Sequence, residues 1–227
     1  MIVLITSIFD QHAQSFVNEL GVNSALLTCQ QLAEKSMVIC DPAFQKSRLT
    51  LNGKSYQITE ISLVINCLSY IDPSELFCFP EEERQYQAAE FHALLVYFLS
   101  SLSCPVFGRA STLSLAGPAL NRVDWQHLAI AAGLPIISTN FENNQLDSIG
   151  QTDLKQFNLI IVGKILTTPS NTCADQYIKQ LAQYLQLDYL EVNFCLGKGD
   201  KIFFKDATSK PSLQNPEVRR AILDYLN

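Results

Sequence analysis

Short apolar runs alternate with amphipathic stretches at the start of the chain, and together they predict a strand–helix–strand unit. Ile2–Thr6 is an apolar run that is typical of a buried parallel strand. The next apolar residues recur at helical spacing: Ala13, Phe16, Val17 and Leu20. Asp10 can cap this helix and Gly21 can end it, before a second short strand at Ala25–Thr28.

The following segments predict further strands and one long helix. Three short strands are expected at Met37–Asp41, Arg48–Leu51 and Ser55–Ile58, with Asn52-Gly53 as a hairpin turn, and buried strands at Ser62–Cys67 and Pro105–Phe107. From Glu81 onward, one apolar stripe at helical spacing predicts a helix: Phe91, Leu94, Leu95, Phe98, Leu99 and Leu102. Glu81–Arg84 lies at its start, where the helix dipole favours carboxylates.

The second half of the chain predicts a smaller α+β piece. The expected helices are Arg122–Ala132, Asp175–Leu185 and a last one that begins at Pro216, and the expected strands are Pro135–Thr139, Leu159–Val162, Tyr189–Phe194 and Lys201–Phe204. Asn140–Phe157 is polar and is expected to be a loop. The Pro- and Gly-bearing stretch Gly117–Asn121 is the expected boundary. The chain is therefore predicted to be an α/β protein with domains at residues 1–120 and 121–227, of which the first holds a parallel-type sheet flanked by helices.

Charge and cysteine content limit the class of partner and the compartment. The net charge is −6, from 16 Lys+Arg against 22 Asp+Glu, and no run of basic residues is present, which argues against nucleic acid as a partner. The 7 cysteines are scattered without a Cys-x-x-Cys pair, which favours reduced thiols over disulfides or zinc. Neither a signal peptide nor a membrane-spanning run is evident. We expect a cytoplasmic protein that does not bind membranes.

Three stretches, residues 5–20, 121–141 and 181–213, carry a family resemblance through their order and spacing. They resemble the peptide-maturing ATP-grasp ligases of the microviridin and graspetide type. The Gly133-Leu134-Pro135 and Ser138-Thr139 residues match a strand motif of that family, and Leu187-Asp188-Tyr189 begins its penultimate strand. The resemblance implies a pre-ATP-grasp-like N-terminal domain followed by a shortened ATP-grasp-like domain.

The residues that hold magnesium in that family are replaced in this chain. The family's Asp position is occupied by Asn193, its Glu position falls at Lys205 and its Asn position at Ala207. A one-residue slip of the alignment would supply Asp206 as a single ligand. Because magnesium requires several oxygen ligands, one carboxylate beside a lysine is a poor site for it. We therefore predict no catalytic residue and no cofactor.

The middle of the chain is also short for a nucleotide-binding ligase. From Phe141 to Asp175 the sequence offers one strand and no clear helix, too little for the subdomain that covers the nucleotide in the family. Lys164 is the sole candidate for a phosphate-binding lysine there, and Arg122 stands where family members often carry Lys. Both have an alternative interpretation as solvated surface charges.

These observations leave three functional hypotheses. The leading one is a non-catalytic ATP-grasp-like protein that acts as a binding or accessory subunit in peptide modification, with a peptide, another protein or a second copy of itself as partner. The alternative is a compact ATP-dependent carboxylate–amine or carboxylate–hydroxyl ligase that uses ATP and magnesium through Lys164, Arg122 and Asp206. A third is a small-molecule binder whose site lies at the edge of the first sheet near Ser7–Asp10.

Overall fold

The computed structural model describes residues 1–34, 37–38, 47–51, 53–111, 114–118, 120–136, 155–163, 165–167, 172–197 and 201–227. The chain forms two compact units, and each is described by itself. The first unit comprises Met1–Ala119 together with Ser209–Asn227, and the second comprises Leu120–Thr208.

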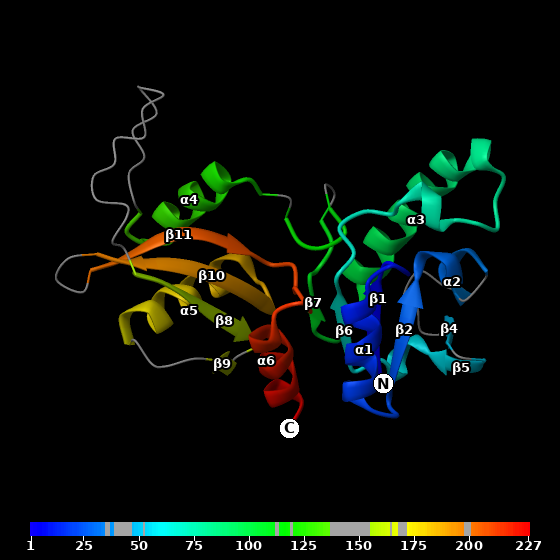
Figure 1. Cartoon of the computed structure of the whole chain (residues 1–227), viewed down its shortest axis with the longest axis horizontal. Coiled ribbons are helices and arrows are strands. Elements are labelled where there is room, and N and C mark those ends of the chain that lie inside the picture. Colours follow the sequence, from blue (N-terminus) through cyan, green and yellow to red (C-terminus); the bar gives the residue numbers. More distant parts are fainter. Residues whose placement is uncertain are drawn as a thin grey trace. The chain divides into compact units, whose positions relative to one another are not determined.

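The first unit is built on a parallel sheet of four strands in the order β2-β1-β6-β7 (Figure 1). Its strands are β1 (Ile2–Thr6), β2 (Ser24–Thr28), β6 (Leu63–Asn66) and β7 (Val106–Phe107). All neighbouring pairs are parallel, and Leu4 of β1 pairs with Leu26 on one side and Ile65 on the other. The apolar runs in these strands are buried, as expected for a parallel sheet covered on both faces. The predicted α/β class with an N-terminal parallel sheet is confirmed.

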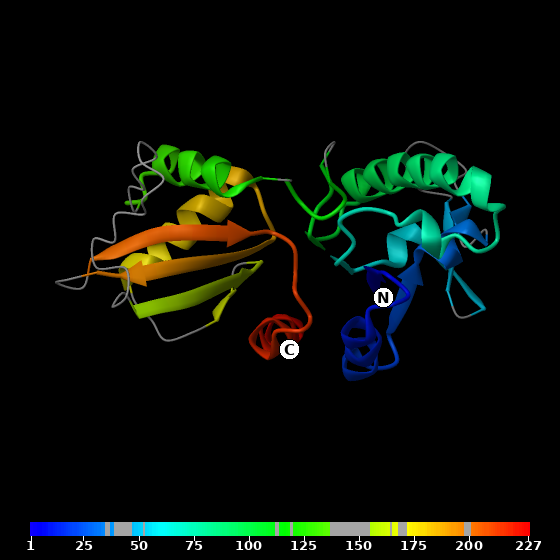
Figure 2. The ribbon, with the colours of Figure 1, turned by 45° about the horizontal axis from the view of Figure 1, so that its top comes forward.

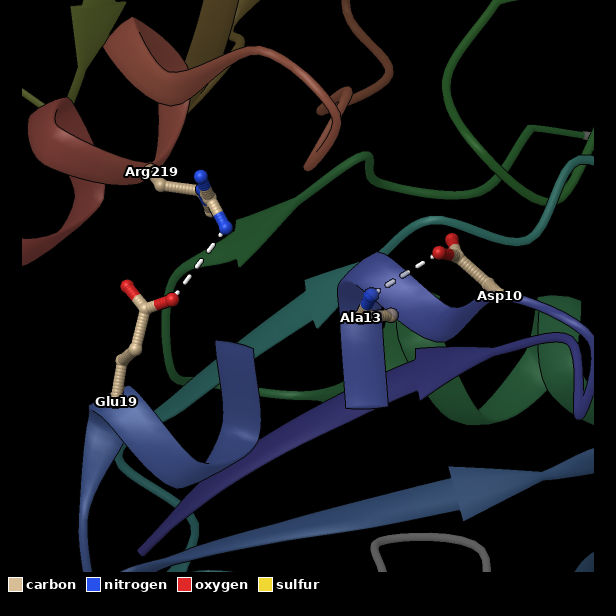
Figure 3. A network of polar contacts seen from close by, with 4 residues as sticks. All are labelled: Asp10, Ala13, Glu19 and Arg219. Carbon is tan, nitrogen blue, oxygen red and sulfur yellow. Dashed lines mark hydrogen bonds and ion pairs between the residues drawn. The ribbon is translucent and has the colours of Figure 1, made fainter. Parts of the chain in front are cut away.

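Helices connect these strands and supply much of the first core. They are α1 (Gln11–Leu20), α2 (Cys29–Ala33), α3 (Glu81–Ser101) and α6 (Pro216–Leu226), together with short 3₁₀ helices at Ile58–Glu60 and Pro73–Glu75. The carboxylate of Asp10 caps α1 by accepting a hydrogen bond from the Ala13 N–H at 3.0 Å (Figure 3). The predicted stripe of α3 contributes Leu95, Phe98 and Leu99 to the core, each fully buried.

A small antiparallel sheet completes the first unit. It contains β3 (Met37–Val38), β4 (Arg48–Leu51) and β5 (Lys54–Gln57) in that order. The sequence placed the last of these strands at Ser55–Ile58, but Ile58 begins a 3₁₀ helix instead. The Gln57 N–H donates to the Glu60 carboxylate at 2.6 Å, which stabilises the start of this helix.

The C-terminal segment belongs to the first unit, although the sequence placed residues 121–227 in one domain. The Tyr225 ring lies edge-on to the Phe107 ring of β7, with 5.3 Å between centroids. Arg219 donates to the Glu19 carboxylate of α1 at 3.4 Å (Figure 3). Because α6 is amphipathic, its apolar side can serve as part of a core that is remote in sequence, and no local pattern indicates which core that is.

The second unit is an antiparallel sheet in the order β11-β10-β8-β9 with two helices (Figure 2). Its elements are α4 (Arg122–Ala131), β8 (Lys155–Val162), β9 (Ile165–Thr167), α5 (Thr172–Leu185), β10 (Tyr189–Leu196) and β11 (Ile202–Thr208). Strand β8 begins at Lys155, so the predicted loop ends earlier than Phe157, whose ring stacks on that of Phe194 at 5.6 Å. Within the expected strand at Pro135–Thr139, Ile136 forms a parallel bridge with Phe204, and residues 137–139 lie outside the described residues.

Among the helices of the described ranges, none combines the length and the apolar character that crossing a membrane requires.

Candidate functional site

One face of the second sheet is packed in an apolar cluster, and the opposite face carries polar side chains beside the buried residues Ile160, Val162, Tyr189 and Cys195. Residues Leu190, Val192 and Phe194 alternate along β10 and are buried in the same cluster as Trp125 of α4 and Ile178 of α5. Both helices therefore cover this face of the sheet. The residues between them on β10, including Glu191 and Asn193, point to the opposite face because side chains alternate along a strand.

A β-bulge between β10 and β11 decides which residues of β11 join this polar face. Asn193 pairs with Asp206 and the next residue, Phe194, pairs with Phe204, so Lys205 is the extra residue of the bulge. Asp206 therefore lies directly opposite Asn193. The sequence does carry a signal for the bulge, since the alternation of Ile202 and Phe204 is broken by two consecutive polar residues.

The polar side chains of this face bind one another across the strands. The Asn193 side-chain amide donates to Asp206 Oδ1 at 2.5 Å, and Lys205 Nζ donates to Gln156 Oε1 at 2.8 Å. Glu191 accepts from the Asn158 amide at 2.8 Å and, through its other carboxylate oxygen, from the Tyr189 hydroxyl at 3.2 Å. Both carboxylates of this face are thus held by neutral donors from neighbouring positions.

Magnesium does not fit this arrangement. Asn193 turns its N–H donor and not its carbonyl oxygen toward Asp206, and the residue beside Asp206 is the ammonium-bearing Lys205, which repels a cation. Throughout the described parts of the chain, no group of three or more His, Cys, Asp or Glu side chains could hold a metal ion. The residues present at the expected metal position therefore disagree with the ligand set that the family resemblance implies.

The two other residues predicted to bind a cofactor are Lys164 and Arg122. Lys164 lies outside the described residues. Arg122 is the exposed first residue of α4. Burial raises the pKa of the Cys195 thiol on β10, and among smaller effects Lys205 and Arg122 oppose that rise. The structure thus brings Arg122 within electrostatic range of the strand that carries Asn193, and Asp206 lies within the same range.

A cavity of about 340 Å³ in the first unit is a second candidate site. It lies at the carboxyl ends of β1 and β6 and is lined by Ser7 and Asp10, the residues that the sequence marked as a third possibility. Sequence reasoning missed its other charged residues, Asp72, Glu75 and Lys210. The first two follow β6 in a short helix whose Asp-Pro start is visible in the sequence, but Lys210 is far from both along the chain.

A parallel α/β unit and an antiparallel sheet backed by two helices are the components of the ATP-grasp ligase fold, and solved structures of that class match the whole chain. The chain is similar to the macrocyclase MdnB from Microcystis aeruginosa, with 14% identity and a TM-score of 0.63 over 99% of this chain and 98% of the other. It is similar to the ATP-grasp ligase PsnB complexed with a phosphomimetic variant of a minimal precursor, Mg and ADP, with 11% identity and a TM-score of 0.67 over 100% and 98%.

A third similar structure is a Chryseobacterium gregarium RiPP-associated ATP-grasp ligase in complex with ADP and a leader and core peptide. It shares 12% identity with a TM-score of 0.62 over 99% of this chain and 96% of that one. No family model matches the chain, and no curated protein matches it by sequence. At this level of identity the likeness establishes the fold and leaves the activity to be argued from the site.

Proposed function

We propose that this chain is a non-catalytic ATP-grasp-like protein that binds a peptide or protein partner as an accessory subunit in peptide modification. The observation that carries the proposal is the hydrogen bond from the Asn193 amide to Asp206. It occupies the carboxylate that a metal would need, and an uncharged amide stands where a second carboxylate would neutralise the metal's charge.

The physical reason is the charge that develops in phosphoryl transfer. Metal ions bridge the phosphates and neutralise that charge, and they require hard oxygen ligands to do so. At this position an uncharged amide replaces one carboxylate and the Lys205 ammonium stands beside the other. A divalent cation placed there would meet electrostatic repulsion from the lysine and would have to displace the amide.

The peptide side of the proposal rests on the fold's relatives. The similar structures include the macrocyclase MdnC bound with its precursor peptide MdnA and PsnB complexed with a minimal precursor. A chain of this fold that has lost the metal ligands can keep a peptide-binding surface, since recognition and phosphoryl transfer use different residues. Its partner would be a peptide, a complete ligase or a second copy of the chain.

The alternative is a compact ligase that binds ATP and magnesium through Lys164, Arg122 and Asp206. Two observations favour it: Asp206 and Glu191 lie on the same open face of the sheet, and similar structures were solved with ADP and Mg. In that case the Asn193 amide would leave Asp206 when nucleotide binds.

Calorimetric titration with ATP, with and without magnesium, separates the two. We expect no heat from the wild-type chain up to millimolar ATP. A double variant, Asn193→Asp with Lys205→Glu, places carboxylates around Asp206 and should gain binding of Mg²⁺, measured by titration with the metal alone. Asn18→Asp with Lys179→Glu makes the same change of charge at two exposed helix positions and serves as the matched control.

Micromolar, magnesium-dependent ATP binding by the wild-type chain would overturn the non-catalytic proposal. Loss of that binding in Asp206→Asn and in Arg122→Ala would then support the ligase. Sedimentation velocity over a wide range of protein concentration tests whether the partner is a second copy, and selection from a displayed peptide library tests peptide binding.

A further inference from the structure

The cavity of the first unit lies at the switch point of the parallel sheet. In the order β2-β1-β6-β7, the chain leaves β1 toward β2 on one side and leaves β6 toward β7 on the other. The carboxyl ends of adjacent strands then open a crevice between the diverging connections, which is where open α/β sheets bind ligands. The cavity is lined by Thr6 and Asp10 after β1 and by Cys67 and Leu68 after β6, so it occupies that crevice.

Three carboxylates line the cavity, and each is held in place by the backbone. Asp10 accepts from the Ala13 N–H at 3.0 Å, and Asp72 accepts from the Ser74 N–H at 2.9 Å. Glu75 accepts from the Ile8 N–H at 3.0 Å. Across the described residues, none of the three carboxylates forms an ion pair. Backbone donors fix their positions without neutralising their charge.

Glu75 is the buried member of the three carboxylates. Its side chain is only 2% exposed, and the Ile8 N–H binds one of its two carboxylate oxygens. The other oxygen has no hydrogen-bond donor in the described part of the chain. That oxygen is open to the cavity, since it is not among the fully buried polar atoms without a partner in the described residues. A cation or a hydrogen-bond donor that enters the cavity can therefore reach it.

Two aromatic rings add a second feature that favours cations. Phe9 is 64% exposed and Tyr70 is 65% exposed, and both line the cavity. Large aromatic side chains with this much exposure, placed beside carboxylates, suit an organic cation, because the negative face of the ring attracts positive charge. A metal ion is a poorer fit, since the described residues contain no group of three ligands close enough to bind one.

The charges of the residues that line the cavity also favour a cation over an anion. Lys210 is the cavity's single ammonium against three carboxylates, and it is exposed. A ligand cation would still meet a negative surface and would be repelled only by this flexible side chain. An anion such as phosphate would be repelled by Asp10, Asp72 and Glu75 together.

We propose that this cavity binds an alkylammonium group, with Glu75 and Asp10 facing the charge and with Phe9 and Tyr70 contacting the alkyl chain and the cation. The ammonium can be the side chain of a lysine in a peptide or a free amine. The peptide form rests on the proposed function, whereas the recognition of the ammonium rests on the cavity alone. Failure of ATP binding or of peptide selection therefore does not bear on it.

The test is a titration of the full chain, followed by NMR or calorimetry, with N-acetyl-lysine amide as the probe. N-acetyl-norleucine amide is the uncharged control of similar shape. We expect binding of the lysine compound at about 1 mM and no measurable binding of the norleucine compound. A glycine-flanked lysine hexapeptide distinguishes the two sources: tighter binding than the amide assigns the site to peptides, and equal binding assigns it to the amine alone.

Isosteric variants connect the binding to the cavity. Glu75→Gln keeps an acceptor for the Ile8 N–H and should weaken binding roughly tenfold by removing the buried charge. Phe9→Ala with Tyr70→Ala should weaken it by a smaller factor, and Lys210→Met should tighten it. Glu60→Gln is the matched control, because Glu60 also accepts from a backbone N–H but lies outside the cavity. Equal binding of the norleucine compound, or an unchanged affinity in Glu75→Gln, would overturn the proposal.

Discussion

The two polar regions of this chain bind their carboxylates with different donors. On the second sheet, side chains pair with side chains across the strands, as Asn193 does with Asp206 and Lys205 with Gln156. In the cavity of the first unit, Glu75 accepts from a backbone N–H, and Asp10 accepts from a backbone N–H and from the Thr6 hydroxyl at 3.2 Å.

This difference affects how readily each region can bind a ligand. A paired amide and carboxylate must separate before either can bind anything else, and that separation reduces affinity. A carboxylate fixed by its backbone neighbours loses nothing when a cation arrives, because its position is already set. The face of the second sheet that carries Asn193 and Asp206 is thus the less suited of the two regions to bind a charged ligand.

The largest expected effect concerns a buried asparagine beside the cavity-lining residues Cys67 and Leu68. Asn66 at the end of β6 is 0% exposed; its amide donates to the carbonyls of Gly108 and Leu115, and its side-chain oxygen accepts from the Leu68 N–H. Asn66→Ala leaves these three backbone groups unpaired and should lower the free energy of unfolding by about 4 kcal/mol, since each buried unpaired group costs roughly 1–3 kcal/mol.

Urea unfolding measures this change. Asn158→Ala in the second unit is the control, because that side chain makes one hydrogen bond across the sheet, to Glu191, and should cost about 1 kcal/mol. If both variants lose the same stability, the interpretation of Asn66 as the residue that holds these three backbone segments together is wrong.

The second effect appears at high pH. Burial, followed by the nearby Glu75, raises the pKa of the Cys29 thiol to about 12, and burial, followed by Asp10, raises that of Cys67 to about 12, from 9.0. In the unfolded chain these thiols lose their protons near pH 9 while the folded chain retains them. The stability they confer is therefore complete below pH 9 and should fall between pH 9 and 12, by up to about 1.4 kcal/mol per pH unit for each thiol.

Chemical unfolding at several pH values tests this slope, which should become shallower in Cys67→Ala. Cys195→Ala supplies the comparison from the second unit, where Lys205 and Arg122 oppose the rise in pKa, so its slope should change less. If the slope of stability against pH changes equally in Cys67→Ala and Cys195→Ala, the two thiols do not differ in their electrostatic surroundings as proposed.

A smaller effect is expected on the polar face. Asn193→Ala removes the donor to Asp206 and should cost about 1 kcal/mol, as is typical for a partly buried hydrogen bond. A double-mutant cycle with Asp206→Ala, followed by urea unfolding, should give a coupling energy of about 1 kcal/mol. A coupling near zero would mean that the pair does not hold Asp206 and would favour the ligase alternative.

The smallest effect belongs to the ion pair between Arg219 of α6 and Glu19 of α1. Both side chains are partly exposed, so solvent screens the interaction, and Arg219→Ala should cost no more than about 0.5 kcal/mol. Arg220→Ala, an exposed neighbour on the same helix, is the matched control in the same unfolding experiment. A loss well above 1 kcal/mol for Arg219 alone would show that α6 is held by charge more than by its apolar face.

Much of the candidate site could be anticipated from residue types, and its geometry could not. The sequence predicted that Asn193 and Lys205 stand at the metal positions that the resemblance implies, and Asp206 was named as the one remaining carboxylate; this assignment stays a prediction. Which of Lys205 and Asp206 faces Asn193 depends on the bulge, because a shift of one residue in strand register exchanges the partners. The roles assigned to Lys164 and Arg122 remain predictions.

The residues of the cavity also differ in how far the sequence predicts their roles. Asp10 was recognised as a helix cap at the sheet edge, a role that local spacing predicts and the structure confirms. Glu75 had no distinguishing mark in the sequence, because its burial and its contact with Ile8 join positions that only the parallel pairing of β1 and β6 brings together.

The sequence by itself determined the local elements of this protein, namely its buried strands, its amphipathic helices and their caps, because these depend on the spacing of apolar and capping residues along a few turns of chain. Only the tertiary structure decided that α6 joins the first unit, that Asn193 pairs with Asp206, and that three carboxylates and two aromatic rings line one cavity. Those outcomes depend on which distant segments pair, and pairing is decided by the packing of whole sheets and helices, which no short stretch of sequence specifies.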